Sequence, residues 1–283
     1  MKNPLSRRLL RELRQDIGKY IALFLFLMLT TGFISGFLVA DGSMVRAYDE
    51  SFEKYDIESG HFILEDKLPD ETKAKLEAAG VSVYELFYKE ATLDNENTVR
   101  IFKNRSEVNK TDVLEGRLPE SKGEIAADRL YLENNGLTIG DELAGLKITG
   151  AVALSDYSAL FKNNTDMMLD ANKFCVAVVT PETFDEIDEN VHLCYAWLNN
   201  DKTLSDEQCR DKADEISDIL AEACSITELV KREDNQAISF TGEDMGGDKA
   251  MMTTLLYVVI VILGFVFAIT TRSTIEQESG TVG

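Results

Sequence analysis

Two long stretches of the chain contain no charged side chain, and they dominate its pattern of apolar and polar positions. They cover residues 20–40 and 250–271, and each contains twelve residues from the set Leu, Ile, Val and Phe. As α-helices they would be about 31 and 33 Å long at 1.5 Å per residue. A hydrocarbon core of roughly 30 Å needs about 20 residues, and a buried core helix seldom runs this far without a charge. The pattern therefore predicts two transmembrane helices, with residues 41–249 between them.

The residues before the first run predict the orientation. Residues 1–19 contain six basic side chains and two acidic ones, and basic residues beside a span favour the cytoplasmic side. The alternative is a cleaved signal peptide, whose apolar region is only about 7–15 residues long and ends in small residues. The run here is longer, and its exit, residues 38–41, fits such a site poorly. We expect a multi-pass protein of the plasma membrane, with both ends of the chain cytoplasmic and residues 41–249 extracytoplasmic.

An apolar stripe recurs at every fourth position within residues 1–19, at Leu5, Leu9, Leu13 and Ile17. With arginines on the other faces, this pattern is typical of an amphipathic helix that lies in the inner headgroup layer and contacts membrane lipid. An ordinary solvated helix that contains several leucines is the alternative.

The segment 41–249 alternates strand and helix signals. Helices are predicted over 69–79, with Gly80 as a C-cap, and over 205–223, where Ser205 and Gln208 form a capping-box pair. The predicted strands around these helices are 61–64, 81–86, 99–102, 192–198 and 226–230. Two strand–helix–strand units that are far apart in the sequence indicate one split α+β subdomain with an insertion between its halves.

The predicted insertion, about residues 105–185, differs from the rest of the segment in composition and in its predicted secondary structure. It is rich in glycine and contains short β-like runs at 146–152 and 175–179 and a short helix near 127–134. These signals are typical of a small, mostly β subdomain. Just before the second apolar run, Gly246-Gly247 either loosens or breaks a helix that leads into the span, or belongs to a plain linker; the sequence leaves both open.

Charge and composition exclude two classes of protein. Lys plus Arg is 29 and Asp plus Glu is 50, so the formal net charge is −21, which a nucleic-acid backbone would repel. Hydrophobic residues make up 45% of the chain, which excludes a disordered acidic tail.

The sequence offers little chemistry for catalysis or metal binding. It contains no G-x-x-x-x-G-K-[ST] phosphate-binding motif and no nucleophile–base constellation, so we expect neither an enzyme nor a cofactor in this chain. His192 lies two residues from Cys194, but a zinc site needs four ligands at typical spacings. Acidic residues are abundant, yet the 12-residue calcium loop is absent. We therefore predict no metal site.

Two further sequence features have two possible outcomes each. Four cysteines, Cys175, Cys194, Cys209 and Cys224, lie in the outer segment, where disulfides are permitted. They are either four free thiols or include a bridge from Cys194 to Cys209 or to Cys224. Residues 167–169, Met-Met-Leu, either form an exposed apolar tip for a partner or take the commoner course and enter the core.

Three segments resemble the permeases of MacB-type and FtsX-like ABC transporters. Residues 116–143 carry a Gly-Arg-x-Pro turn, a Gly-Glu-Ile strand, a short helix and a Gly-Asp pair, in the order found in the extracytoplasmic core domain of that family. Residues 272–283, RSTIEQESGTVG, are similar to the opening of the FtsX-like signature, and residues 155–170 resemble the form found in large Firmicute-type permeases. The motif positions are Gly116, Arg117, Pro119, Gly123, Glu124, Gly140 and Asp141.

The resemblance implies a fold, a mechanism and partners. The fold is an α+β extracytoplasmic domain, with a porter-like, split ferredoxin-like unit and a β-rich insertion, between two transmembrane helices. Family members dimerise, as homodimers or heterodimers, and ATP hydrolysis by a separate ATPase subunit moves their outer domains through stalk helices, here about 41–55 and from 245 onward. The family has at least four spans, so this chain would be its N-terminal part.

The resemblance also gives the cytoplasmic end a role. We expect the segment from Arg272, with Glu276, Glu278 and Gly280, to face the ABC ATPase; a solvated helix end is the alternative. A two-span sensor whose outer domain binds a ligand is the alternative function. Sensors usually continue into a long cytoplasmic output region, whereas the residues after 271 match a permease motif.

Overall fold

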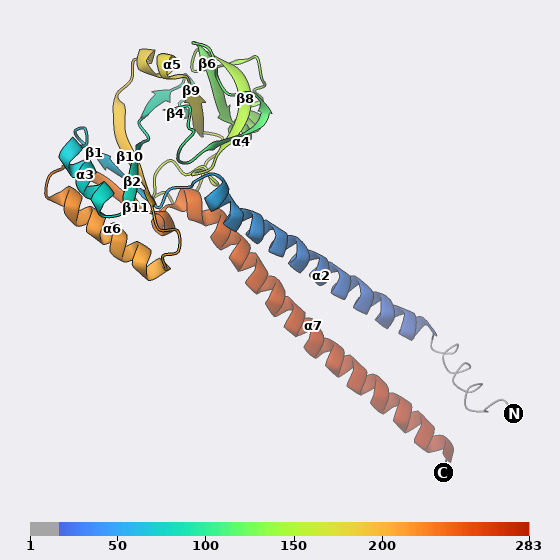
Figure 1. Cartoon of the computed structure of the whole chain (residues 1–283). Helices are drawn as coiled ribbons and strands as arrows, with labels where there is room; N and C mark the ends of the chain where they lie inside the picture. The colour runs from blue at the N-terminus through green and yellow to red at the C-terminus, as the bar shows by residue number, and fades with distance from the viewer. Residues whose placement is uncertain (1–16, 283) are drawn as a thin grey trace. The chain divides into compact units, whose positions relative to one another are not determined.

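The computed structural model of the chain describes residues 17–282, and it divides them into two units. One unit contains residues up to 46 and from 244 onward, and the other is a mixed α+β unit over residues 47–243. Two long helices, α2 (Ile17–Lys54) and α7 (Gln236–Val282), flank a large sheet, which confirms the predicted α+β class between two apolar helices. Figure 1 shows the elements in chain order.

Both long helices are apolar enough to cross a membrane. The candidate spans lie within Ile21–Lys54 and Gln236–Ile269, and only 6% and 0% of their most apolar windows are buried by protein. Large apolar side chains are exposed along them, such as Phe24 at 62% and Phe265 at 67%. Water would not favour such surfaces, whereas lipid would, so these helices are compatible with two spans.

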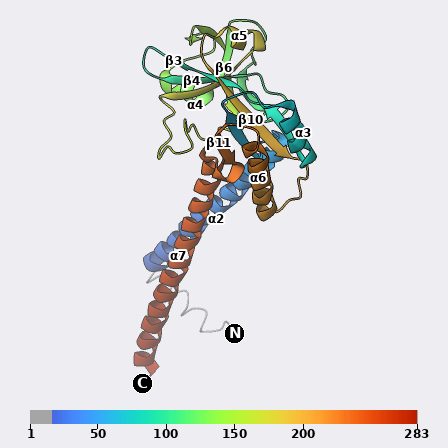
Figure 2. The same cartoon turned by 90° about the vertical axis from the view of Figure 1, so that its left-hand side faces the viewer.

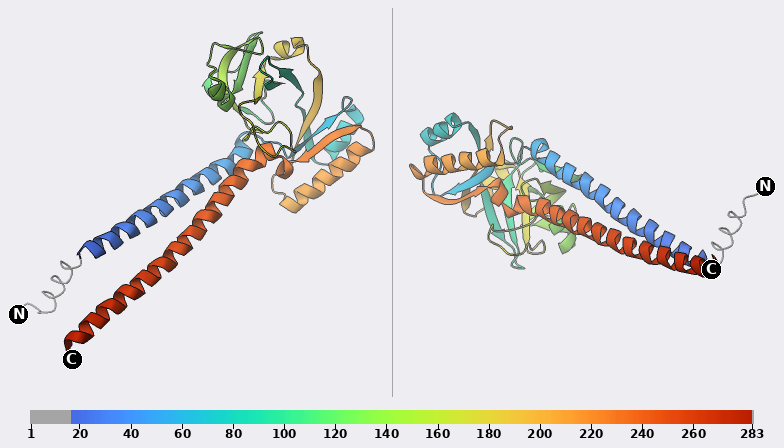
Figure 3. Two further views of the ribbon diagram at one scale, coloured as in Figure 1. Left: turned by 180° about the vertical axis from the view of Figure 1, so that it is seen from behind. Right: turned by 90° about the horizontal axis from the view of Figure 1, so that it is seen from below.

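The Gly246-Gly247 pair does not interrupt α7. The helix passes through both glycines as part of one 47-residue element, and Figure 3 shows α2 and α7 as unbroken ribbons. Two glycines cost a helix roughly 2 kcal/mol in total, which a long cooperative helix absorbs. The structure therefore shows neither a helix break nor a plain linker at this position, and a loosened helix stays a prediction.

The sheet of the α+β unit has eleven strands in the order β11-β1-β10-β3-β4-β9-β6-β8-β5, with β2 on β10 and β7 on β8. The strands are β1 (Gly60–Leu64), β2 (Val81–Glu85), β3 (Tyr88–Thr92), β4 (Thr98–Lys103), β5 (Thr111–Gly116), β6 (Glu124–Asp128), β7 (Glu142–Leu143), β8 (Leu146–Leu154), β9 (Phe174–Val179), β10 (Val191–Asn199) and β11 (Ile226–Lys231). β10 joins the two parts of the sheet, since it pairs with β1 and β2 over most of its length and with β3 at its first two residues.

Four strands and two helices form the first part of the α+β unit. β1, β2, β10 and β11 pair in antiparallel fashion in the order β11-β1-β10-β2, and α3 (Asp70–Ala78) and α6 (Asp206–Ala221) lie side by side on one face (Figures 1 and 2). These elements confirm the predicted strands and helices to within two residues. The predicted capping box is also present, because Ser205 and Gln208 exchange hydrogen bonds.

Aromatic side chains dominate the core under these two helices. Phe62 stacks on Tyr195 and Trp197 with ring centroids 5.4 and 6.2 Å apart, and Leu76 and Ile216 from the helices are fully buried beside them. The backbone of Gly60 passes so close to Trp197 that a Cβ would lie 2.2 Å from the indole ring. Only glycine fits there.

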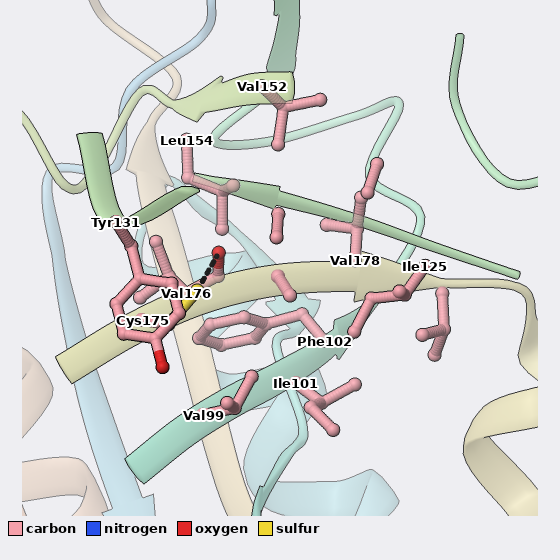
Figure 4. Packing of buried hydrophobic residues seen from close by; sticks show 14 of the residues in the cluster. Val99, Ile101, Phe102, Ile125, Tyr131, Val152, Leu154, Cys175, Val176 and Val178 are labelled. Carbon is pink, nitrogen blue, oxygen red and sulfur yellow. Dashed lines mark hydrogen bonds between the residues drawn. The ribbon is translucent and has the colours of Figure 1, made fainter. Parts of the chain in front are cut away.

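The second part is β-rich and lies between β2 and β10 in the sequence. Strands β3 to β9 surround a core of Val, Ile and aromatic side chains, and every residue of β9 is buried. Figure 4 shows two parts of this core, with Tyr131 beside Cys175 and Val176 and with Phe102 near Ile101 and Ile125. A short helix, α4 (Arg129–Asn135), matches the predicted one, and α5 (Pro181–Glu186) was not predicted.

The Met-Met-Leu segment lies at the surface. Met167 and Met168 are 98% and 82% exposed, while Leu169 is partly buried against the β-rich core. Core burial, the commoner course for such side chains, is therefore wrong for both methionines. Their loop contains local polar contacts, such as the hydrogen bonds from Asn163 to Asp166.

Candidate functional site: the junction at the roots of the two long helices

The ends of α2 and α7 that lie within the α+β unit meet in a network of buried polar contacts. We call this network the root junction and define it as residues 48–59, 109–110, 158–164 and 232–242. It combines the last turns of α2, the first turns of α7 and two loops of the β-rich part. The following contacts all lie within the α+β unit.

The helix α2 ends in a motif that uses an aspartate where glycine is usual. The N–H of Ile57 donates to the carbonyl oxygen of Phe52 at 3.0 Å, and that of Asp56 donates to Glu53 at 3.4 Å. Asp56 has a φ of +46°, which is the left-handed conformation of a Schellman motif. This conformation costs a non-glycine residue roughly 1–2 kcal/mol. The Asp56 carboxylate is held by Lys110 Nζ at 2.6 Å, which fixes the point where the chain leaves α2.

Glu58 connects three parts of the chain at the centre of the root junction. Its side chain is 2% exposed. Asn109 Nδ2 donates to Glu58 Oε2 at 2.6 Å, and Asn109 Oδ1 accepts the backbone N–H of Glu58 at 2.8 Å. His61 Nδ1 lies 2.6 Å and Asn235 Nδ2 3.4 Å from Glu58 Oε1, and Arg232 Nε donates to the Glu58 carbonyl oxygen at 2.5 Å. One carboxylate thus links the end of α2, an insertion loop and the residue before α7.

The first turn of α7 is fixed by side chains from outside the helix. Asn235 Oδ1 accepts the N–H of Ala237 at 3.1 Å, so Asn235 acts as an N-cap. Asn164 Oδ1 accepts the N–H of Gln236 at 2.8 Å, and Ser158 Oγ donates to the Ala237 carbonyl oxygen at 2.9 Å. The loop 158–164 therefore holds the start of α7 at two backbone groups.

Direct contacts also join the two helix roots. The Tyr48 hydroxyl donates to the Ile238 carbonyl oxygen at 2.9 Å, and the Arg232 guanidinium lies 5.1 Å from the centre of the Phe52 ring. A Cβ on Gly242 would lie 2.6 Å from the Tyr48 ring, so the glycine permits this close approach. The two roots are packed as one element, and a displacement of either helix root must move its partner root or break these contacts.

Two buried pairs of opposite charge lie at or beside the network, and mutual attraction outweighs burial in the Glu58–His61 pair. Burial opposes ionisation of both Glu58 and His61, but their mutual attraction outweighs it. The charge of His61, with hydrogen bonds from His61 and Asn109, lowers the pKa of Glu58, and the Glu58 carboxylate raises the pKa of His61. Beside them, Arg105 Nη1 donates to Asp156 Oδ1 at 2.6 Å. Burial raises the pKa of Asp156 in spite of this partner.

A polar cavity of about 110 Å³ adjoins the root junction and is lined by Glu58, His61 and Arg100 among others. The arginine in its lining, Arg100, is held by protein groups: it donates to Glu90 at 2.9 Å and to the Tyr157 hydroxyl at 2.8 Å. The Arg100 and Glu58–His61 contacts around this cavity join separate segments of the chain. The arrangement is suited to holding elements together.

The motif residues that carry the family resemblance build an exposed turn elsewhere in the fold. Between β5 and β6, Arg117 Nη1 and Nη2 donate to Glu124 Oε2 and Oε1 at 2.9 and 2.5 Å. Glu124 also accepts the backbone N–H groups of Glu120 and Ser121 at 2.9 and 3.0 Å. The bonds from Arg117 and from these backbone groups lower the pKa of Glu124 to about 2. The Arg-Glu pair of the motif is thus a turn lock.

The remaining motif positions have backbone roles. Gly116 has a φ of +73°, and a Cβ there would lie 2.4 Å from the Thr149 carbonyl oxygen. The Pro119 carbonyl oxygen accepts Asn104 Nδ2 at 2.8 Å. Asp141 Oδ2 accepts the N–H and hydroxyl of Thr138, both at 2.8 Å. Gly123 and Gly140 have φ values of +81° and +105°, which glycine adopts without strain.

The residues predicted to face an ATPase all lie in the last turns of α7. Arg272 is exposed, whereas the side chains of Glu276, Glu278 and Gly280 lie outside the described part of the structure. Their role stays a prediction. The root junction and the motif turn have no residue in common with this segment.

The cysteines and His192 form neither a disulfide nor a metal site among the described residues. All four cysteines are free thiols, with Cys175 and Cys194 buried and Cys209 and Cys224 partly exposed. His192 stacks on Tyr88 with ring centroids 4.5 Å apart. Within residues 17–282, no group of three His, Cys, Asp or Glu side chains is placed to hold a metal ion.

Sequence reasoning missed every residue at the centre of the root junction. Glu58, Asn109, Arg232 and Asn235 are common polar residue types without a motif, and they are separated by up to 177 positions. A polar Asn before an apolar helical run was the one local signal, since it suggests an N-cap at Asn235.

Comparisons with known proteins leave the family open. No family model matches the sequence, and no curated protein matches it. Among solved structures, the chain is similar to one described as "Putative Lipoprotein from Bacillus anthracis", with 16% identity and a TM-score of 0.32. The match covers 61% of this chain and 99% of that chain. A similarity at this level supports no conclusion about function.

Proposed function

We propose that this chain is the N-terminal part of a permease subunit of a MacB/FtsX-type ABC transporter. In this role it couples ATP hydrolysis by a cytoplasmic partner to movement of the extracytoplasmic domain, for efflux or mechanotransmission. The chain itself contributes no ATPase activity, and ATP binds to the partner subunit. The N-terminus is cytoplasmic, and the subunit forms a homodimer or a heterodimer.

The observation that carries the proposal is the continuity of the two helices with the root junction. α2 and α7 each contain an apolar stretch of transmembrane length and continue as helix into the α+β unit. There their roots are joined by Tyr48 and Ile238 and by the contacts of Glu58. A helix transmits displacement along its axis, so this construction is suited to moving a domain from inside the cell.

The strand order supports the family part of the proposal. β1-α3-β2 and β10-α6-β11 follow each other as two strand–helix–strand units in an antiparallel order β11-β1-β10-β2. This is the connectivity of a ferredoxin-like unit that has been split by an insertion, here the β-rich part between β2 and β10. A fold does not prove a function, but it agrees with the porter-like unit that the motifs imply.

Affinity purification tests the proposed partner. The tagged full-length protein, solubilised from its native membrane, should retain an ABC ATPase, and replacing Glu276 and Glu278 with Lys should weaken this retention. Glu77→Lys, on the exposed face of α3, is the matched control and should leave retention unchanged. Retention of a kinase or receptor module instead would favour the two-span sensor. Equal retention by all variants would refute the role of this segment.

A reversible cross-link tests the mechanical part. In a variant without the native cysteines, Tyr48→Cys with Ile238→Cys should be bridged by a reducible bifunctional thiol cross-linker that locks the two roots, because the Tyr48 side chain reaches across to the Ile238 carbonyl oxygen. ATP turnover of the assembled complex should fall and recover with a reductant. Tyr48→Cys alone is the control. If the locked complex hydrolyses ATP as fast as the reduced one, root movement is not coupled to the ATPase.

A further inference from the structure

A cavity of about 180 Å³ opens on the root junction between α2, α6 and the start of α7. Tyr48, Phe52 and Ile238 form its apolar wall, and Arg232 lies beside Phe52 at the base. The last residue of the predicted first span, Ala40, is eight positions before Tyr48 in the sequence. The cavity is distinct from the polar cavity at His61, because it is apolar on one side and cationic at one end.

Arg232 is the unusual cation of this region. Its neighbours are paired with carboxylates, Arg210 with Glu233 at 2.7 Å and Lys231 with Asp214 at 2.9 Å. Among the described residues, Arg232 forms no ion pair and donates instead to carbonyl and hydroxyl oxygens of residues 57–59. Burial lowers the pKa of Arg232, although the charge of Glu58 opposes this shift. An anion at the cavity would give Arg232 the direct charged partner that its neighbours already have.

The acidic side chains at the cavity do not cancel this charge. Glu233 is bound to Arg210, and Asp206 is exposed in the first turn of α6. The attractive partner for Arg232 is therefore a ligand with one negative group. Tyr48 and Phe52 form an apolar wall, and covering apolar surface with an apolar group is favourable because it removes that surface from water. We therefore expect the ligand to carry an apolar part as well.

We propose that this cavity binds a single-chain anionic amphiphile, with its carboxylate or phosphate group at Arg232 and its alkyl chain against Tyr48, Phe52 and Ile238. Since the cavity lies between the two helix roots, a bound molecule would wedge them in a fixed spacing. This site is independent of the proposed transport function and would exist in a sensor as well.

Cysteine alkylation tests the site in the full chain, reconstituted in phosphatidylcholine nanodiscs. Cys209 lines the cavity and is partly exposed, whereas Cys224 is partly exposed and does not line it. Decyl phosphate should slow alkylation of Cys209 by roughly tenfold at about ten times its Kd, since only the free site reacts. Cys224 should react at an unchanged rate and is the internal reference.

Three matched probes separate the contributions of head group and chain. Decanol and decyltrimethylammonium have the same chain without the anion, and inorganic phosphate is the anion without the chain; none should protect Cys209. Equal protection by decanol, or none by decyl phosphate, would overturn the proposal. Protection of Cys224 to the same extent would show a general membrane effect and would also overturn it.

Two variants complete the test. Arg232→Gln should raise the half-protecting concentration of decyl phosphate about tenfold or more, because a charged hydrogen bond is lost. Because Arg232 also holds residues 57–59, its replacement can disturb the fold. Ser239→Phe, which places an aromatic side chain at a lining position of the cavity that is not part of the Glu58 network, should abolish protection while the melting temperature stays unchanged. Protection that persists in a folded Ser239→Phe variant would place the ligand elsewhere.

Discussion

The root junction and the Arg117–Glu124 turn are both held by a carboxylate, yet the two carboxylates work in opposite surroundings. Glu58 is 2% exposed, and its bonds join segments from three parts of the chain. Glu124 is bound within its own turn by Arg117, Glu120 and Ser121. Hydrogen bonds from Arg117 and from two backbone N–H groups lower the pKa of Glu124 to about 2. The pKa of Glu58 is lowered by His61 and Asn109 although burial opposes this shift.

The difference shows which polar contacts contribute most to stability. When an exposed ion pair breaks, water replaces the protein partners, so the pair adds little to the free energy of unfolding and mainly orders its own turn. Water cannot replace a lost hydrogen-bond partner of a buried carboxylate, so losing any one partner is costly. Because Glu58 and its partners are buried together, we expect the root junction to be costly to disturb.

The largest effect is expected from Glu58→Ala. It leaves Asn109, His61 and Asn235 without their shared acceptor in a buried site, and breaking a buried network costs about 3–5 kcal/mol. Trp197, the one tryptophan of the chain, is buried in the α+β unit and reports its unfolding by fluorescence. Glu77→Ala, at an exposed position of α3, is the control and should unfold like the wild type. A Glu58→Ala protein of unchanged stability would contradict the assigned role.

The next largest effect comes from replacing glycines with a positive φ, and a pair of variants distinguishes a steric clash from backbone strain. Gly116→Ala should cost roughly 2–4 kcal/mol, because the new Cβ would meet the Thr149 carbonyl oxygen at 2.4 Å in addition to the strain of a positive φ. Gly136→Ala also has a positive φ, but open space surrounds it, so only about 1–2 kcal/mol is expected. Chemical denaturation of both variants measures the difference. Equal costs would show that the close approach at Gly116 relaxes.

A smaller, pH-dependent effect tests the His61–Glu58 pair. The raised pKa of His61 means that its contribution to stability is complete below pH 6.5 and is lost as the pH rises through the folded value. The lowered pKa of Glu58 means that its contribution is present above pH 4.5 and is lost as the pH falls through its folded value.

Melting temperatures of the wild type and His61→Gln across the pH range check this prediction. The wild type should have its greatest advantage between pH 4.5 and 6.5, and the two curves should converge on the alkaline side. His192→Gln provides the matched control, since His192 stacks on Tyr88 away from Glu58. A difference that is constant with pH would show that His61 contributes through packing alone.

The smallest effect is expected from Arg117→Ala. Its pair with Glu124 is bidentate but exposed, so the melting temperature should fall far less than in Glu58→Ala, and the difference from the wild type should shrink at high salt. A double-mutant cycle with Glu124→Ala isolates the pair from the backbone bonds of Glu124. A loss as large as that of Glu58→Ala would remove the contrast between the two regions.

Local signals in the sequence were enough to predict most of the first part of the α+β unit. Ser205 and Gln208 predicted the start of α6, and the strands at 61–64 and 226–230 appear as β1 and β11. These features depend on residues within one turn or one strand, where short-range sterics and hydrogen bonds decide the conformation. At two other positions the structure decided between alternatives that the sequence left open. Gly246-Gly247 stays within one continuous helix, and Met167 and Met168 are exposed at the surface.

The sequence by itself determined the two apolar runs, the acidic domain between them and the alternation of strands and helices. Each follows from composition or spacing along a short stretch, which needs no partner to be recognised. Only the tertiary structure decided that Glu58, Asn109 and Asn235 meet at the roots of α2 and α7. A buried polar contact depends on which distant segments exclude water together, and no single stretch of the chain carries that information.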